Sequence, residues 1–523
     1  MDALARRTPL LVLVAASIVS ISSFIYFFSQ GMTNNYGDGV AHVNIARKVV
    51  DSPDNGFWQR YIQIGSPWLP LQTVLMLPLV ANDSLWRTGA AGSLLSMASF
   101  VVSALMLYLL ASETYGEKGP AAQILALITI EILVLNPSGI YLQTTPLTEW
   151  VFIAALSTSV YLLQRWVRTQ SDRALTIAGL AMAVATLSRY EAWPVAAIAP
   201  LTVYLSAGSS TRYRLSRAAL FAIFAALGPA YWLWHNFAIY GDPLEFLTGP
   251  SSARGLYNQN RASLGWAQIF VGNALLDFAV MLTAAAVCAG PLLILAATLG
   301  SAKATLSLRR SISRRAPLLL LGIPFVFHVF SIYRGEIQVF PLSIFGLLNA
   351  RYGLAHLPLI AMLAPASVLI FKPRYRLRAA VALMVLIAGQ YAMLISEGPR
   401  QLAVFQEGYR NGVNSRSARE LARLSQYLRA NPPEGTVLMT AGPFGPVVPH
   451  GGLRFSNIIH EGTARWHRLD DGIPEDVSTV ILRRGDPLDL RLQSNQRTAG
   501  DLKRSFYESY NDEGIVVLLR VRS

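Results

Sequence analysis

Asp38 and His42 open the first of three short clusters whose residue types could transfer protons or bind anions. The cluster reads Tyr36-Gly-Asp-Gly-Val-Ala-His-Val-Asn-Ile-Ala-Arg47 and begins a predicted amphipathic helix that extends to Val50. His42 follows Asp38 by one helical turn and shares its face. A carboxylate and an imidazole so placed could share a proton or supply two ligands to a metal ion. The ordinary alternative is that Asp38 only caps the helix.

Glu149 and the pair Arg189 and Glu191 belong to the other two clusters. Glu149 ends the run Thr144-Thr-Pro-Leu-Thr-Glu149, whose proline opens a predicted helix. A favourable interaction with the helix dipole would be the ordinary reason for a carboxylate here. It does not by itself explain a carboxylate that lies at a membrane boundary and faces other helices. Arg189 and Glu191 lie in the predicted tight turn Ser188-Arg-Tyr-Glu-Ala-Trp-Pro194. They could pair with each other or contact a substrate.

Four arginines in two later loops complete the candidate residues. They are Arg254, Arg261, Arg334 and Arg351, with Tyr257 close to the first two. A planar guanidinium binds phosphate through paired hydrogen bonds, and a tyrosine suits contacts to sugar or phosphate. Contact with lipid head groups is the ordinary alternative.

The elements that must position these clusters are membrane helices. The 523-residue chain is 53% hydrophobic and only 14% charged, whereas soluble chains average about 25% charged residues. A spanning helix needs about 20 mostly apolar residues. We predict an all-α polytopic membrane protein with eleven spans, near 9–29, 87–112, 119–136, 146–166, 174–188, 193–208, 217–238, 274–299, 316–333, 353–371 and 378–396. The apolar segments 68–80 and 339–348 are too short or proline-interrupted to span and are predicted to be interfacial or re-entrant.

The distribution of positive charge predicts the orientation. Much of the net charge of +14 lies in short loops, which hold Lys118 and the basic runs 165–173, 212–217, 303–315 and 372–378. The positive-inside rule places these loops and the N-terminus in the cytoplasm. The charge therefore requires no nucleic-acid partner. All three clusters and the long first loop, 30–86, then lie on the outer face, and the single cysteine, Cys288, excludes an intrachain disulfide.

The polar tail is predicted to be a small C-terminal α/β domain on the outer face. It combines an amphipathic helix near 415–430 with three strand candidates, 436–439, 477–482 and 515–521. We therefore divide the chain into a transmembrane domain, 1–399, and an extracytoplasmic domain, 400–523.

The order of the motifs resembles a known family. Asp38, Ala46 and Arg47 match a pattern Asp-Glu-x-x-Tyr-x-x-x-Ala-Arg, from which the chain departs at Gly39 and His42. The stretches Gly65-Ser-Pro-Trp-Leu-Pro70 and Thr145-Pro-Leu-Thr-Glu149 are similar to the two motifs that follow. Together they resemble membrane glycosyltransferases of the C superfamily (GT-C), close to the protein O-mannosyltransferases and the lipid A aminoarabinose transferase, over residues 1 to about 400.

This resemblance implies a GT-C-like fold and an inverting glycosyltransferase. A sugar would move from a polyprenyl-phosphate donor to a hydroxyl of an acceptor protein, lipid or glycan, at the outer face of a bacterial inner membrane. Asp38 would be the general base, Glu149 would position the acceptor or a cation, and arginines would stabilise the leaving phosphate. Substrate contacts would come from His42, Arg189, Glu191, Arg254, Tyr257, Arg261, Arg334 and Arg351.

Cofactor use and one rival function stay open at this point. No cofactor is required, while a divalent metal held by Asp38 and His42 is left open. The main alternative is a transporter or lipid flippase, for which Glu131 and His328 are the candidate intramembrane residues.

Overall fold

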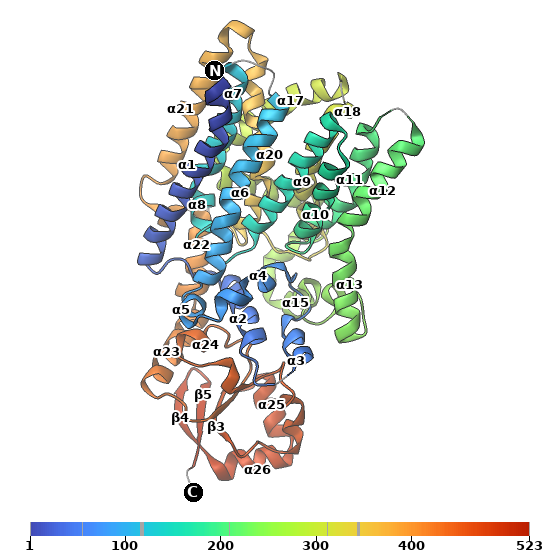
Figure 1. The fold of residues 1–523 in the computed structure, drawn as a ribbon. Coiled ribbons are helices and arrows are strands. Elements are labelled where there is room, and N and C mark those ends of the chain that lie inside the picture. The colour runs from blue at the N-terminus through green and yellow to red at the C-terminus, as the bar shows by residue number, and fades with distance from the viewer. Residues whose placement is uncertain are drawn as a thin grey trace. The chain divides into compact units, whose positions relative to one another are not determined.

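The computed structural model resolves two compact units, which are described separately (Figure 1). Unit 1 contains residues 1–32, 66–72 and 93–407, and unit 2 contains 33–65, 73–92 and 408–523. Residues 1, 55, 116–119, 209, 311, 343–345 and 522–523 are not described, nor are the side chains of 2–6, 120–121, 263, 306–310 and 312. Lys118 and the middle of the predicted segment 339–348 therefore lie outside the described residues.

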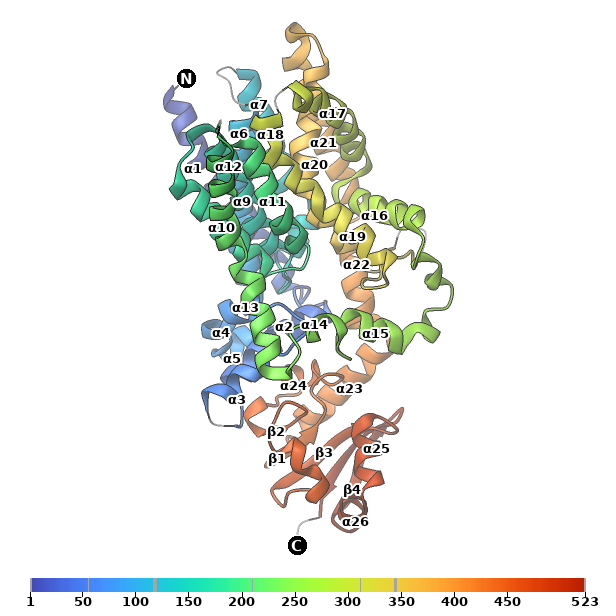
Figure 2. The same cartoon turned by 90° about the vertical axis from the view of Figure 1, so that its right-hand side faces the viewer.

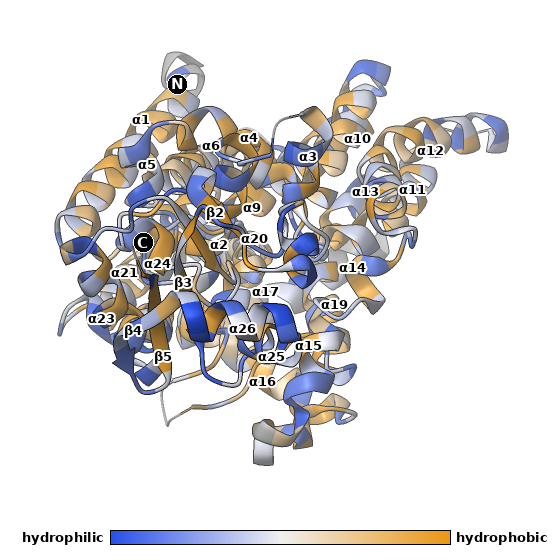
Figure 3. Cartoon of the chain, turned by 90° about the horizontal axis from the view of Figure 1, so that it is seen from below, coloured by the Kyte–Doolittle hydropathy of each residue, from blue (hydrophilic) through white to orange (hydrophobic). Residues whose placement is uncertain are grey.

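Unit 1 consists mainly of helices, and apolar residues are frequent in many of them (Figure 3). Among the described residues, 5 helices are long and apolar enough to span a bilayer, or up to 7 if each of two bent pairs is one span. The five are Arg7–Ser29, Ala90–Tyr115, Ser313–Tyr333, Ala350–Ile370 and Pro373–Leu394. The chain is thus an integral membrane protein, while the count of eleven spans stays a prediction.

The helices of unit 1 that bear on the site follow in chain order. They are α1 (Asp2–Ser29), α6 (Ala90–Tyr115), α7 (Pro120–Val134), α8 (Pro137–Leu142), α9 (Glu149–Thr169), α10 (Asp172–Thr186), α11 (Ala192–Ser206), α12 (Thr211–Ala225), α13 (Leu227–Tyr240), α14 (Glu245–Thr248), α15 (Ala253–Asn260), η2 (Arg261–Phe270), α16 (Ala274–Ala289), α17 (Pro291–Arg310), α19 (Ile323–Tyr333), η4 (Ala350–His356), α20 (Leu357–Leu363) and α21 (Arg376–Leu394).

Two predicted spans are interrupted in the structure. The segment 217–238 is not one straight helix, because α12 and α13 meet at a bend of 41°. Pro229 explains the bend, since it lacks the N–H that would bond the carbonyl of Ala225. The segment 274–299 is also two helices, α16 and α17. Gly290 separates them with a φ of 100°, and Pro291 begins the second.

Unit 2 contains a five-stranded sheet of order β2-β1-β3-β5-β4. The strands β1 (Thr436–Met439), β2 (Ile458–Ile459) and β3 (Val477–Arg483) are parallel, and β5 (Ile515–Arg520) pairs antiparallel with β3 and with β4 (Phe506–Asp512). The helix α23 (Arg416–Ala430) precedes the sheet, and α25 (Pro487–Ser494) and α26 (Gln496–Ser505) follow β3. The predicted amphipathic helix and three strands of the tail are confirmed. The two other strands escaped prediction because β2 is only two residues long and β4 is largely polar.

Much of the long loop 30–86 also folds within unit 2 (Figure 2). It forms α2 (Gly37–Val50), α3 (Phe57–Tyr61), η1 (Ile62–Ile64), most of α4 (Leu71–Val80) and α5 (Asp83–Arg87). Asn44 of α2 donates a 2.8 Å hydrogen bond to the carbonyl of Gly445, 401 residues later. The unit is therefore assembled from segments at the two ends of the chain.

Candidate functional site

Glu149 is the centre of a buried group of charged side chains in unit 1. It is the first residue of α9 and only 1% exposed. Its Oε1 atom accepts a hydrogen bond of 3.1 Å from Nη1 of Arg189, which also donates to the Thr148 hydroxyl at 3.0 Å. Arg351, on η4, brings Nη1 to 3.7 Å from the same Oε1 atom. One carboxylate thus faces two guanidinium groups.

Glu191 extends this group to two buried histidines. It lies in the turn between α10 and α11, where its Oε1 atom accepts from Nε of Arg189 at 2.7 Å and lies 2.9 Å from Nε2 of His328. Nδ1 of His328 is in turn 3.3 Å from Nε2 of His356. Burial would raise the pKa of Glu191, but Arg189 and His328 outweigh it and hold that pKa well below its ordinary value. Glu191 is therefore an ionised anchor for Arg189.

Tyr352 packs against the same cations. Its ring centroid is 5.1 Å from the guanidinium carbon of Arg189 and 5.7 Å from that of Arg351, within the range of cation–π attraction. The ring also lies 5.2 Å from that of His328. These contacts hold the two guanidinium groups beside one aromatic face.

Some buried polar atoms of this group keep unused bonding capacity, among them one on Glu149 and one on His356. Oε2 of Glu149 and Nδ1 of His356 are buried and have no hydrogen-bond partner among the described residues. Buried polar atoms are almost always paired, and one that is not calls for an explanation. Oε2 of Glu149 can accept a proton or a hydrogen bond from a hydroxyl, and the neighbouring guanidinium groups can stabilise a negative charge.

Asp38 and His42 belong to unit 2. Asp38 lies half-buried in the first turn of α2, and His42 is buried one turn later. The N-cap is Tyr36, so the helix begins two residues earlier than an Asp38 cap would require, and that interpretation is wrong. Asp38 and His42 have the spacing of two metal ligands on one helix, yet no group of three His, Cys, Asp or Glu side chains suited to a metal ion occurs in the described part of the chain.

The remaining candidate cations lie apart from the Glu149 group. Arg254 is exposed on α15, Arg261 hydrogen-bonds Gln268 within η2, and Arg334 pairs with Glu336 at 2.8 Å. Tyr257 is buried, and it lines a small apolar cavity together with residues of η2 and of the segment 332–340. The structure therefore brings together Glu149, Arg189, Glu191 and Arg351 and leaves Arg254, Arg261 and Arg334 elsewhere on the unit.

His356 was missed by the sequence analysis, and His328 was considered only as a transporter residue. Both lie in apolar helical segments, where an ionisable side chain is itself a signal of function. His356 lies near the start of the predicted span 353–371 and follows the loop residue Arg351 by five residues. That proximity was the available clue, but it does not identify the partner of either residue.

Comparisons with known proteins find likeness in structure alone. No protein-family model and no curated protein matches the sequence. ArnT from Cupriavidus metallidurans, solved bound to undecaprenyl phosphate, is similar over 98% of this chain and 98% of its own, with a TM-score of 0.55 and 14% identity. The oligosaccharyltransferase AglB from Archaeoglobus fulgidus, solved with an inhibitory peptide and a dolichol-phosphate, is similar over 99% of this chain and 75% of its own, with a TM-score of 0.52 and 14% identity.

A second structure of the Archaeoglobus fulgidus oligosaccharyltransferase, a complex with Zn and sulfate, gives the same picture. It is similar over 97% of this chain and 73% of its own, with a TM-score of 0.51 and 14% identity. Both proteins are glycosyltransferases of the C superfamily. The chain has their fold, and the predicted fold class is confirmed.

Proposed function

We propose that this protein is an inverting glycosyltransferase that moves a sugar from a polyprenyl-phosphate donor to an acceptor hydroxyl. The observation that carries the proposal is the shared fold over nearly the whole chain with two transferases, one solved with undecaprenyl phosphate and one with dolichol-phosphate. The partners are then a lipid-linked sugar and an acceptor protein, lipid or glycan. A lipid-linked donor needs no nucleotide-binding site, which agrees with a sequence that contains no glycine-rich phosphate-binding motif.

The residues support a division of labour in this reaction. Asp38 is the proposed base, because an acceptor hydroxyl is a poor nucleophile until its proton is removed as the new bond forms. Glu149, with its unpaired Oε2 atom, is proposed to hold an acceptor hydroxyl or a cation. Arg351 is proposed to stabilise the departing phosphate, since its guanidinium is buried and fixed beside Tyr352. Arg254, Tyr257, Arg261, Arg334 and His42 remain proposed substrate contacts.

We propose that the reaction takes place at the outer face of a bacterial inner membrane. The support is the concentration of basic residues in short loops, which favours a cytoplasmic N-terminus and an extracytoplasmic segment 400–523. In this arrangement residues 1–399 form the transmembrane domain. Cysteines introduced singly into the loops, labelled from one side of intact cells, would test that orientation.

Sugar transfer by the purified protein tests the function. Protein in nanodiscs would receive radiolabelled polyprenyl-phosphate sugars and an envelope extract as acceptor, and labelled product would be counted. Wild type is compared with Asp38→Asn, which keeps the size of the side chain and removes the base. Glu113→Asn serves as a control, because in the described part of unit 1 Glu113 pairs with Arg168 at 2.8 Å, and neither residue belongs to the Glu149 group.

The two variants separate the parts of the proposal. Transfer by wild type and by Glu113→Asn, with its loss in folded Asp38→Asn, supports both the reaction and the base. Transfer that survives in Asp38→Asn keeps the reaction and refutes Asp38 as the base. Protein that transfers none of a panel of donors, while moving an intact lipid-linked sugar across a vesicle membrane, refutes the reaction in favour of a flippase.

A further inference from the structure

Helix α2 is fixed at its middle and at its end, away from the proposed base. Asn44 donates to the carbonyl of Gly445 at 2.8 Å and accepts from Nε1 of Trp86 at 2.9 Å. Gly445 belongs to the segment that follows β1, and Trp86 belongs to α5. The middle of α2 is therefore tied to both other parts of unit 2.

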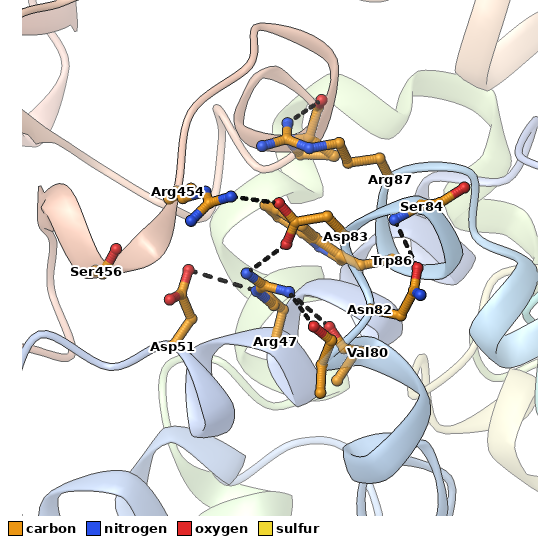
Figure 4. Close-up of polar contacts among 12 residues, drawn as sticks. Arg47, Asp51, Val80, Asn82, Asp83, Ser84, Trp86, Arg87, Arg454 and Ser456 are labelled. Atoms are coloured by element: carbon orange, nitrogen blue, oxygen red, sulfur yellow. Dashed lines mark hydrogen bonds and ion pairs between the residues drawn. The ribbon is translucent and has the colours of Figure 1, made fainter.

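Arg47 holds the end of α2 through the two Nη atoms of its guanidinium, and its Nε atom contributes a longer ion pair (Figure 4). Nη1 donates to the carbonyl of Val80 at 2.7 Å, Nη2 lies 2.8 Å from Oδ1 of Asp83, and Nε lies 3.4 Å from Asp51. The side chain is only 6% exposed, and the planar group stacks 4.4 Å from the centroid of Trp86. A lysine could not reproduce this set, because its ammonium is a point charge without a plane.

Trp86 is enclosed by a second guanidinium. Arg87 lies 4.7 Å from the Trp86 centroid and donates to the carbonyls of Pro449 and Leu453 at 2.8 and 3.1 Å. The indole is 1% exposed. Two arginines thus contact one buried ring, one reaching from α2 and the other reaching toward the C-terminal segment.

Asp83 completes the connection to the C-terminal segment. Its Oδ1 atom pairs with Arg47, and its Oδ2 atom accepts from Nη2 of Arg454 at 2.7 Å (Figure 4). Burial opposes the charged form of Asp83, but Arg47 and Arg454 outweigh it and hold the pKa of its carboxyl below the ordinary value. The carboxylate is therefore ionised near neutral pH and bridges the two cations.

We propose that Arg47 is a positioning residue for the transfer reaction: through Trp86, Asp83 and Arg454, the segment 408–523 fixes α2 and so places the carboxylate of Asp38. The proposal rests on the proposed function in taking Asp38 as the base. It gives the C-terminal segment a catalytic purpose beyond contact with an acceptor.

Helix geometry gives the size of the effect. Asp38 precedes Arg47 by nine residues, which is about 14 Å along the axis at 1.5 Å per residue. A tilt of about 5° at Arg47 would therefore displace Asp38 by about 1 Å. A displacement of about 1 Å at a reacting group can lower a rate by roughly 100-fold. Loss of Arg47 should lower kcat by about 10- to 100-fold and leave the donor KM within about threefold.

Arg491 offers a matched control in the same unit. It makes two 3.0 Å contacts to the carboxylate of Asp470 and lies 5.8 Å from the centroid of Trp466, so it is another arginine between an aspartate and a tryptophan. It lies on α25, and its partners among the described residues, Asp470 and Trp466, belong to the C-terminal segment. Arg47→Met and Arg491→Met remove the same group and keep a similar stem. Trp86→Phe is a milder second variant, which keeps an aromatic ring but removes the donor to Asn44 and part of the surface that the two guanidinium groups contact.

The experiment measures hydrogen exchange and kinetics on the same full-length preparations. Amide exchange over residues 38–46, by mass spectrometry, should accelerate at least tenfold in Arg47→Met and severalfold in Trp86→Phe, with kcat lowered in both. Arg491→Met should change neither quantity. Wild-type exchange over 38–46 in Arg47→Met and Trp86→Phe overturns the anchoring, whatever the transfer assay gives. Faster exchange with an unchanged kcat overturns the link to Asp38, and transfer that survives Asp38→Asn refutes the base itself.

Discussion

Glu149 and Glu191 bind the same arginine but should respond in opposite ways to substitution by glutamine. Glu191 uses one oxygen for two charge-assisted contacts, to Arg189 at 2.7 Å and to His328 at 2.9 Å. Glu149 has one hydrogen bond to Arg189 at 3.1 Å, and Arg351 at 3.7 Å is beyond hydrogen-bond distance. Glu191 is therefore the more strongly held of the two carboxylates.

The expected losses of stability follow from these contacts. Removing one partner of a buried ion pair typically destabilises by about 3 to 5 kcal/mol, and glutamine at position 191 keeps one acceptor oxygen, so we expect about 3 kcal/mol for Glu191→Gln. Glu149→Gln loses a single charged hydrogen bond, which is worth about 1.5 kcal/mol. For transfer the order reverses. Loss of a positioned carboxylate that contacts the acceptor typically lowers the rate by about 100-fold or more.

The assay compares melting with transfer for the two variants and the Glu113→Gln control. Intrinsic fluorescence in detergent should give an apparent Tm lowered by roughly 5 °C or more in Glu191→Gln and by less in Glu149→Gln. Transfer, measured well below either Tm, should fall far more in Glu149→Gln. If the more destabilised variant is also the less active one, Glu149 is only structural, and the significance given to its unpaired oxygen is refuted.

Three further predictions concern other parts of the chain. Burial and Lys48 lower the pKa of His460 to about 3, and its Nδ1 atom accepts from the amide of Gly462, so the folded state keeps this ring neutral. Below pH 6.5 the unfolded chain binds a proton at this position that the folded chain does not. The free energy of unfolding therefore falls as the pH drops toward 3, by about 2 kcal/mol at pH 5. Hydrogen-exchange protection of the sheet, measured against pH, should show this decrease, and the decrease should be smaller in His460→Gln. Gly353→Ala should destabilise unit 1 strongly in the same melting assay, because the added Cβ would lie 2.1 Å from the carbonyl oxygen of Ala284. Gly389→Ala should be neutral or slightly stabilising, because its added Cβ would meet nothing within 4 Å. Arg351→Lys should raise the donor KM about tenfold because an ammonium cannot form paired bonds to a phosphate, and an unchanged KM would place the phosphate elsewhere.

Local features of the fold could be predicted from the sequence because their signals are local. The strand Thr436–Met439 has the predicted bounds, and α9 begins at Glu149, close to the position expected after Pro146. The pairing of Arg189 with Glu191 was also open to prediction, since the two residues share one turn. Each of these depends on residues within a few positions of one another.

The long-range contacts could not be predicted in the same way. Glu191 meets His328 across 137 residues, and Asn44 meets Gly445 across 401. Neither contact can be predicted from hydrophobic periodicity or from a capping residue. Those patterns indicate the type and bounds of one helix or strand, and they do not indicate which other segment packs against it. The composition of unit 2 was hidden for the same reason, since segments 33–65 and 73–92 resemble an ordinary loop until the tail is folded beside them.

Both groups of buried charges contain polar atoms with no hydrogen bond among the described residues, but in the Arg47 group these atoms, Nε of Arg47 and Oδ2 of Asp51, face each other as an ion pair at 3.4 Å. In the Arg47 group, the guanidinium has a backbone carbonyl, two carboxylates and an aromatic face as partners. Such a group gains little by meeting a ligand, and its natural role is to hold a helix. In the Glu149 group, a buried carboxylate oxygen and a ring nitrogen have no partner among the described residues. Because an unpaired buried polar atom costs about 1 to 3 kcal/mol, it persists most readily where a substrate completes it. The contacts of Arg47 within unit 2 therefore support a positioning role, and the unpaired Oε2 atom makes Glu149 the residue to expect at the substrate.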